Sequence, residues 1–199
     1  MARIQEIAST NPVEIFDKLA GIMLASRSVC VMGVRTAHAP ALVLGQGLLH
    51  VRSSVFVVPE PSVDWYDVLK FFGKDDLLLA VSFPRYWRET IDALRYAREK
   101  GVSAVAITDV AVSPAAQEAD FALLTGTDST GFSLSYTGCF ALIDALLASV
   151  ARTAGKENAE ALAELETIYE KADLFYHTRS TPRKAPAHRD PNDRKGGGP

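Results

Sequence analysis

The sequence predicts an α/β fold, a three-layer α-β-α sandwich around a five-stranded, parallel, doubly wound sheet. Short segments rich in Val, Ile and Leu alternate with helical patterns along most of the chain. The short segments are mostly continuously apolar, as expected for parallel strands that are covered on both faces. A length of 199 residues with 48% hydrophobic and 23% charged residues fits one soluble domain of ordinary size.

The expected elements follow one another in a regular order. Strands are predicted at Ser28–Met32, Ser54–Val58, Leu77–Val81, Ala104–Thr108 and Phe121–Leu124. Helices are predicted at Pro12–Ala25, Ala39–His50, Ser62–Phe72, Arg88–Lys100, a short stretch from Pro114, Ser133–Thr153 and Asn158–Asp173.

Local signals mark several helix ends. Asn11, Pro12 and Glu14 form the pattern of an N-cap, a first-turn proline and a capping-box acid. Ser113 precedes a proline in the same way. Gly101 is expected to take the left-handed conformation that ends a helix before the next strand.

Four regions organise the chain. They are an N-terminal linker helix over residues 1–27, a folded domain over 28–153, a docking helix over 154–176 and a disordered tail over 177–199. The tail carries six basic and two acidic residues and lacks Val, Ile, Leu and Phe, so it cannot form a core. We interpret it as a solvated extension, with an arm that touches a polyanion or a partner subunit as the alternative.

The helix predicted at Ser133–Thr153 is apolar around more than half of its circumference, more than one sheet face can cover. Either the terminal helix or a second subunit must cover the remainder. We favour a subunit interface, because two apolar helices at one end suit a symmetric dimer. The expected assembly is a homodimer or homotetramer.

Charge and cysteine usage exclude several classes of function. A net charge of −3 argues against a protein that mainly grips phosphate backbones. Cys30 and Cys139 lie far apart with no C-x-x-C spacing, and the four histidines are scattered, so we expect no disulfide, no metal site and no cofactor. No apolar run reaches the length of a membrane span, so a cytoplasmic location without membrane contact is expected.

Ligands of doubly wound sheets bind beyond the carboxyl ends of the strands. Gly33, Arg35 and Thr36 follow the first predicted strand, and a turn with two arginines, from Ser82 to Thr90, follows the third. Asp109 follows the fourth strand, where an acceptor that fixes the loop is a more common role than a reactive group.

These segments occur in an order that resembles a known family. Residues 28–153 resemble a sugar isomerase (SIS) domain, and SFPRYWRETIDALRYAREKGVSAVAITD followed by SPAAQEADFALLT resembles the effector domain of RpiR-type regulators, transcription factors that sense phosphorylated sugars. The resemblance implies a five-stranded sheet in flavodoxin-like order, a sugar-phosphate pocket at the strand ends and self-association.

The sequence departs from the family pattern in three places. The first loop of the family usually reads Gly-x-Gly-x-Ser, whereas Arg35 and Ala37 replace the second glycine and the serine here. Pro84, Arg85 and Trp87 occupy a loop that is rich in Ser and Thr in sugar-binding members. The helix-turn-helix domain that precedes the effector domain in RpiR-type regulators has no counterpart here, so this chain alone is not expected to bind DNA.

Three hypotheses of function follow. The favoured one is a sugar-phosphate sensor of regulator type, whose ligand-binding residues would be Gly33, Arg35, Thr36, Ser82, Arg85, Arg88, Asp109, Ser129, Thr130 and Ser133. For the arginines, salt bridges on the rim of the sheet are the structural alternative. The second hypothesis is an aldose–ketose isomerase, which needs a base such as His38 or Glu89, although both also suit a helix surface. The third is an oligomerisation scaffold whose pocket has lost its ligand.

Overall fold

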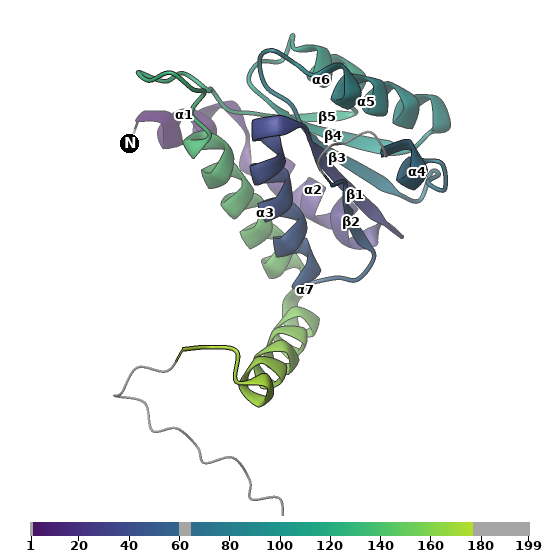
Figure 1. Cartoon of the computed structure of the whole chain (residues 1–199), viewed down its shortest axis with the longest axis vertical. Helices are drawn as coiled ribbons and strands as arrows, with labels where there is room; N and C mark the ends of the chain where they lie inside the picture. The colour runs from purple at the N-terminus through teal and green to yellow at the C-terminus, as the bar shows by residue number, and fades with distance from the viewer. Residues whose placement is uncertain (1, 60–64, 177–199) are drawn as a thin grey trace, which may run out of the picture. The chain divides into compact units, whose positions relative to one another are not determined.

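The structure, a computed structural model, describes residues 2–59 and 65–176 of the chain. Five strands form one parallel sheet in the order β2-β1-β3-β4-β5 (Figure 1). Their bounds are β1 Val29–Gly33, β2 Val55–Val57, β3 Leu77–Val81, β4 Ser103–Thr108 and β5 Phe121–Leu124. This is the predicted flavodoxin-like order, and the predicted α/β class is confirmed.

Strand burial explains why these segments were recognisable in the sequence. Every residue of β1 and β3 is buried, whereas the edge strands β2 and β5 are partly exposed. The central strands are therefore covered on both faces and carry unbroken apolar runs. Strands β3 and β5 have the predicted bounds, and the other three differ at their ends by one or two residues.

Helices cover both faces of the sheet. They are α1 Ala2–Thr10, α2 Val13–Ala25, α3 His38–Leu49, α4 Trp65–Leu69, α5 Arg88–Lys100, α6 Pro114–Glu118 and α7 Thr137–Ala172, with a short 3-10 turn η1 at Arg35–Ala37. The helix predicted at Ser62–Phe72 is shorter, and its first residues lie outside the described part of the chain. The long helix begins at Thr137 and not at Ser133.

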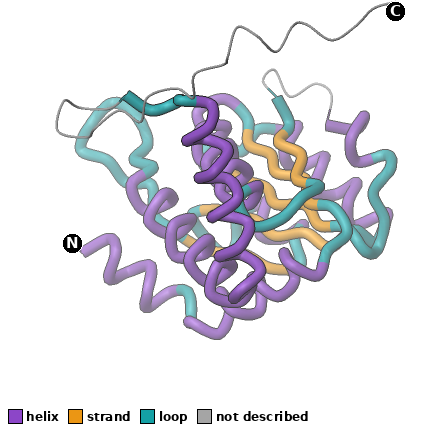
Figure 2. Tube along the Cα trace, turned by 90° about the horizontal axis from the view of Figure 1, so that it is seen from below, coloured by secondary structure: helices purple, strands orange, loops and turns teal. Residues whose placement is uncertain are grey.

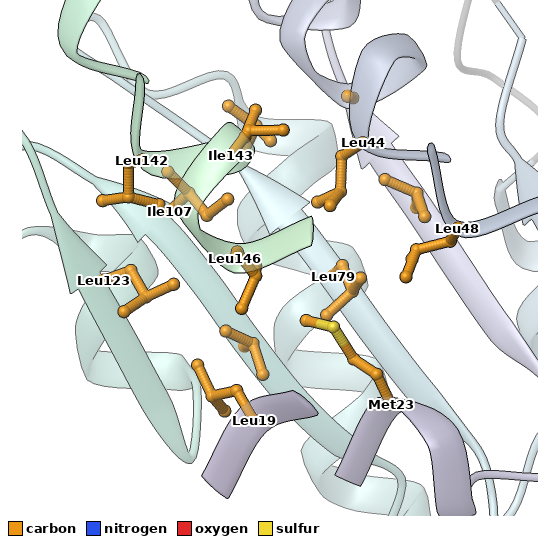
Figure 3. Close-up of a cluster of buried hydrophobic side chains, with 14 of the residues drawn as sticks. Leu19, Met23, Leu44, Leu48, Leu79, Ile107, Leu123, Leu142, Ile143 and Leu146 are labelled. Atoms are coloured by element: carbon orange, nitrogen blue, oxygen red, sulfur yellow. The ribbon is translucent and has the colours of Figure 1, made fainter. Parts of the chain in front are cut away.

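Two apolar cores separate the three layers, and Figure 2 shows the strands running between helices. One core joins α2, α3 and the first part of α7 to one face of the sheet (Figure 3). Its members include the fully buried Leu19, Leu44 and Leu146. The other core joins α4, α5 and α6 to the opposite face. Truncating a fully buried leucine of this kind to alanine destabilises a domain by about 2–5 kcal/mol.

The N-terminal capping prediction is wrong, because the side chain of Asn11 has a tertiary partner. Asn11 is buried, and no side chain caps α2. Its Nδ2 donates to the carbonyl of Leu124 at 2.8 Å, and the Leu124 amide donates to its Oδ1 at 2.7 Å. The side-chain amide thus pairs with the end of β5 as a short strand would.

The other two helix-end predictions are confirmed. Ser113 caps α6, since its hydroxyl accepts a hydrogen bond from the Ala116 amide at 3.1 Å. Gly101 ends α5 with φ 71°, a left-handed conformation in which a side chain is disfavoured.

The first part of α7 is covered by its own chain. Leu142, Ile143 and Leu146 are fully buried against the sheet. Leu147 packs so closely on α3 that a Cβ at Gly47 would lie 2.3 Å from its Cδ1. Neighbouring helices therefore cover much of the apolar surface that the sequence assigned to a subunit or to the terminal helix. The large exposed apolar side chains of this layer belong instead to α3: Leu42, Val43 and Leu49.

One segment among the described residues, Thr137–Lys156, is long and apolar enough to cross a membrane by length and composition. Its inward side chains belong to the core of the domain, which is the position of a helix in a globular fold. The helix kinks at Gly155, which has φ 61°.

The chain from Ala163 onward forms a separate compact unit. It is helical up to Ala172, and Tyr169 contacts Phe175 edge to face. Docking of this helix on the domain stays a prediction, and the predicted tail at 177–199 lies outside the described residues.

Candidate functional site

The chain leaves β1 and β3 in opposite directions. β1 and β3 are neighbours, but α3 carries the chain from β1 to β2 on one face of the sheet, and α5 carries it from β3 to β4 on the other. The loops after these two strands therefore diverge and leave a crevice between them. This reversal is the place where open α/β sheets bind ligands.

A cleft of about 630 Å³ lies at this edge of the sheet. The loops after β1, β3, β4 and β5 all contribute to it. Its lining residues are Thr36, Pro84, Arg85, Trp87, Asp109, Thr127, Asp128, Ser129, Gly131, Phe132, Ser133, Leu134 and Tyr136. The lining combines one cation with two carboxylates, several hydroxyl groups and three aromatic rings.

A much smaller recess of about 20 Å³ adjoins the cleft. The two cavities share Thr36, Pro84, Trp87 and Tyr136 in their walls, and Ser82 and Thr90 line the recess alone. Ser82 is 3% exposed, and its hydroxyl has no hydrogen-bond partner among the described residues. A buried hydroxyl without a partner carries a desolvation penalty of about 1–3 kcal/mol, which a bound group with a polar atom would relieve.

The loop after β1 depends on two backbone features. A Cβ at Gly33 would lie 2.3 Å from the carbonyl oxygen of Ala37, so the close return of the chain requires glycine. Arg35 has φ 59°, a conformation that favours glycine, at the position where the family pattern has its second glycine. The loop is also held across the crevice, since the hydroxyls of Thr36 and Tyr136 lie 2.8 Å apart.

The loops after β3 and β4 are joined by a tyrosine–carboxylate contact. The Tyr86 hydroxyl donates to Asp109 at 2.8 Å, and the Thr108 hydroxyl donates to the same carboxylate at 3.1 Å. Burial, together with the hydrogen bond and the negative charge of Asp109, raises the pKa of Tyr86 to about 12. The Asp109 carboxylate therefore fixes the loops while it lines the cleft.

The structure brings together part of the predicted ligand set. Five predicted residues line the cleft: Thr36, Arg85, Asp109, Ser129 and Ser133. Ser82 and Thr36 line the recess. Four others lie on neighbouring segments without lining either cavity: Gly33, Arg35, Arg88 and Thr130.

The two candidate bases are outside both linings. His38 begins α3, and Glu89 lies in the first turn of α5. The cleft contains no histidine and no glutamate among the described residues. Within residues 2–59 and 65–176, no group of three or more His, Cys, Asp or Glu side chains is arranged to hold a metal ion.

Several lining residues were absent from the predicted ligand set. Trp87 was noticed in the second loop but was not assigned to the ligand, although it lines both cavities. Tyr136 carries no local sequence signal, because it meets Thr36 across 100 positions of the chain. Asp128 and Phe132 lie in the same loop as the predicted Ser129, and that proximity could have indicated them.

Comparison with known proteins identifies the family. The SIS domain model matches residues 22–149, so the chain belongs to the SIS domain family. The sugar isomerase domain of an RpiR transcription factor from Sphaerobacter thermophilus is 30% identical, with a TM-score of 0.79 over 83% of this chain and 93% of that chain. The likeness to RpiR effector domains that the sequence indicated is thereby confirmed.

Two further relatives extend the comparison. The NanR protein of Vibrio vulnificus, complexed with ManNAc-6P, shares the fold at 17% identity, with a TM-score of 0.76 over 88% of this chain and 67% of that chain. The glutamine–fructose-6-phosphate aminotransferase (isomerizing) of Pyrobaculum aerophilum is 28% identical over 81% of this chain. The chain spans 27% of the length of that enzyme.

Proposed function

We propose that this SIS domain binds a phosphorylated sugar and acts as a ligand-sensing, oligomerising module in the transcriptional control of carbohydrate metabolism. The observation that carries the proposal is the cleft at the crevice between β1 and β3, where Arg85 and the unpartnered hydroxyl of Ser82 lie close to one another along the same loop. A guanidinium and a buried hydroxyl are suitable donors for a phosphate group.

The relatives support this choice of ligand. NanR was solved with ManNAc-6P, and a protein of E. coli CFT073 with the same fold was solved in complex with arabinose 5-phosphate, at 18% identity and a TM-score of 0.65. The likeness to the RpiR domain supports a regulatory role for this chain. The serine-rich loop over 129–133 would then close over the sugar hydroxyls.

The composition of the cleft favours sensing over catalysis. Aldose–ketose isomerisation requires a base within hydrogen-bond reach of the reacting carbons. His38 and Glu89 do not line the cleft, and Asp109 is engaged by Tyr86 and Thr108. We therefore expect the domain to bind sugar phosphates without converting them.

Self-association is part of the proposal. The exposed Leu42, Val43 and Leu49 on α3 are suitable for an interface in a homodimer or homotetramer. Light scattering of the purified chain would measure its mass, and Leu42→Glu with Val43→Glu should reduce it to that of the monomer.

Calorimetry and thermal shift with ManNAc-6P, arabinose 5-phosphate and fructose 6-phosphate test ligand binding, with sulfate as the ionic control. A ligand at 100 times its dissociation constant stabilises a fold by about 2.7 kcal/mol, which corresponds to roughly 5–10 °C in Tm for a domain of this size. Arg85→Ala should weaken binding about tenfold, since it removes a charge-assisted contact.

Lys74→Ala is the matched control. Lys74 precedes β3 and Arg85 follows it, so the two variants lose the same charge at opposite edges of the sheet. Equal effects of the two substitutions would contradict a specific role of Arg85. A screen in which no sugar phosphate exceeds sulfate would refute the binding proposal and favour the scaffold hypothesis.

A further inference from the structure

The small recess and the large cleft are separated by side chains, not by backbone alone. Trp87 and the Thr36–Tyr136 pair stand in the walls of both cavities. The guanidinium carbon of Arg35 lies 5.6 Å from the centroid of the Trp87 ring, so the loop after β1 holds the indole from its side of the crevice. Trp87 is nevertheless 46% exposed, so it forms part of the surface that a ligand meets.

The recess behind Trp87 has the chemistry of an anion site but not the volume. The buried Ser82 hydroxyl lines it without a partner, and the first turn of α5, from Trp87 to Thr90, borders it. No side chain caps α5, a helix of 13 residues, so the amides of its first turn receive no side-chain cap. A volume of about 20 Å³ accepts one water-sized group and no phosphate.

We propose that Trp87 determines the position of the ligand: its indole closes the Ser82 recess to anions, so that the charged group of the ligand binds in the outer cleft at Arg85. The assignment of a sugar phosphate as ligand rests on the proposed function, whereas the closure of the recess does not. Trp87 is therefore a specificity-determining residue that selects ligands by where their anionic group can lie.

Inorganic phosphate tests the closure without any assumption about the sugar. Trp87→Ala and Trp87→Thr open the recess, and calorimetry should show inorganic phosphate binding about tenfold or more tighter than to the wild type, the gain expected from one added charge-assisted hydrogen bond. Adding Ser82→Ala to either variant should abolish the gain. Tyr66→Ala is the matched control, because Tyr66 on α4 is an aromatic residue that is also 46% exposed and lines neither cavity.

Two results would overturn the inference. One is equal phosphate affinity in the wild type and in whichever of the two Trp87 variants is folded by circular dichroism. The other is a gain that persists when Ser82 is also replaced. If the wild type binds no sugar phosphate, the proposed function fails, yet the phosphate comparison still decides whether Trp87 closes the recess.

A double-mutant cycle tests the predicted position of the charged group. If ManNAc-6P or arabinose 5-phosphate binds the wild type, Arg85→Ala should weaken binding about tenfold in the wild type and clearly less in the Trp87→Ala background, where the phosphate reaches Ser82. Equal losses in both backgrounds would show that Trp87 does not decide where the anion lies, and would refute the proposal.

Discussion

The link between Asn11 and Leu124 makes a sharp prediction about stability. Asn11→Ala removes the partners of the Leu124 amide and carbonyl, which lie 2.7 Å and 2.8 Å from the Asn11 side chain. Each group left without a partner costs about 1–3 kcal/mol when buried. Because Leu124 is only partly buried, we expect the low end for each, a total loss of about 2–3 kcal/mol. This corresponds to roughly 4–12 °C in Tm, measured by urea and thermal unfolding.

Asn11→Asp distinguishes this pairing from a helix cap. Asp and Asn are about equally good N-caps, so a capping role predicts a change of only a few tenths of a kcal/mol. In the observed geometry the carboxylate would face the Leu124 carbonyl with no proton to donate, and about 1–3 kcal/mol is lost. Gln46→Glu, the same amide-to-acid change at an exposed position on α3, is the control. An Asn11→Asp variant as stable as wild type would refute the assignment.

Three further predictions concern the strand ends. Gly33→Ala should lower the unfolding free energy by about 1–3 kcal/mol and weaken ligand binding in calorimetry, because its Cβ would lie 2.3 Å from a backbone oxygen of the following turn. Burial alone would raise the pKa of Asp76, but hydrogen bonds from Arg27 and two backbone amides hold it below its ordinary value. The stability that this carboxylate supplies is present above about pH 4 and is lost as pH falls through the lower folded-state pKa, so the deficit of Asp76→Asn in urea unfolding should shrink from neutral pH toward acid. Asp109→Asn should bring the pKa of Tyr86 down from about 12, as an absorbance titration compared with Tyr86→Phe would show.

The fold was predictable because its signals are local. Each central strand is covered by helices on both faces, so β1, β3 and β4 appear in the sequence as unbroken apolar runs. Helix ends were predicted correctly where the cap is formed within one turn, as at Ser113 and Gly101. The prediction failed at Asn11, where a partner 113 positions away outcompetes the neighbouring amides.

The candidate site was predictable in location but not in composition. The rule that ligands bind beyond the carboxyl ends of strands placed the loops correctly and brought Ser82, Arg85 and Ser129 into the correct region. Which side chains face the cavity depends on contacts between loops that are far apart in the chain. Tyr136 reaches the site through its hydrogen bond to Thr36, and no local pattern encodes that contact.

The departures from the family pattern in two loops belong to one structural unit. A left-handed conformation at a residue other than glycine costs roughly 1–2 kcal/mol, and such strain persists where the surroundings enforce it. Arg35 adopts it with φ 59° and lies over the ring of Trp87, a contact worth about 0.5–1 kcal/mol at an exposed site. The stacking offsets part of the strain, and the loss of the glycine becomes tolerable once a tryptophan stands opposite. A pocket that decays after losing its ligand has no reason to acquire such a matched pair, which favours a binding site of altered shape over a vestigial one.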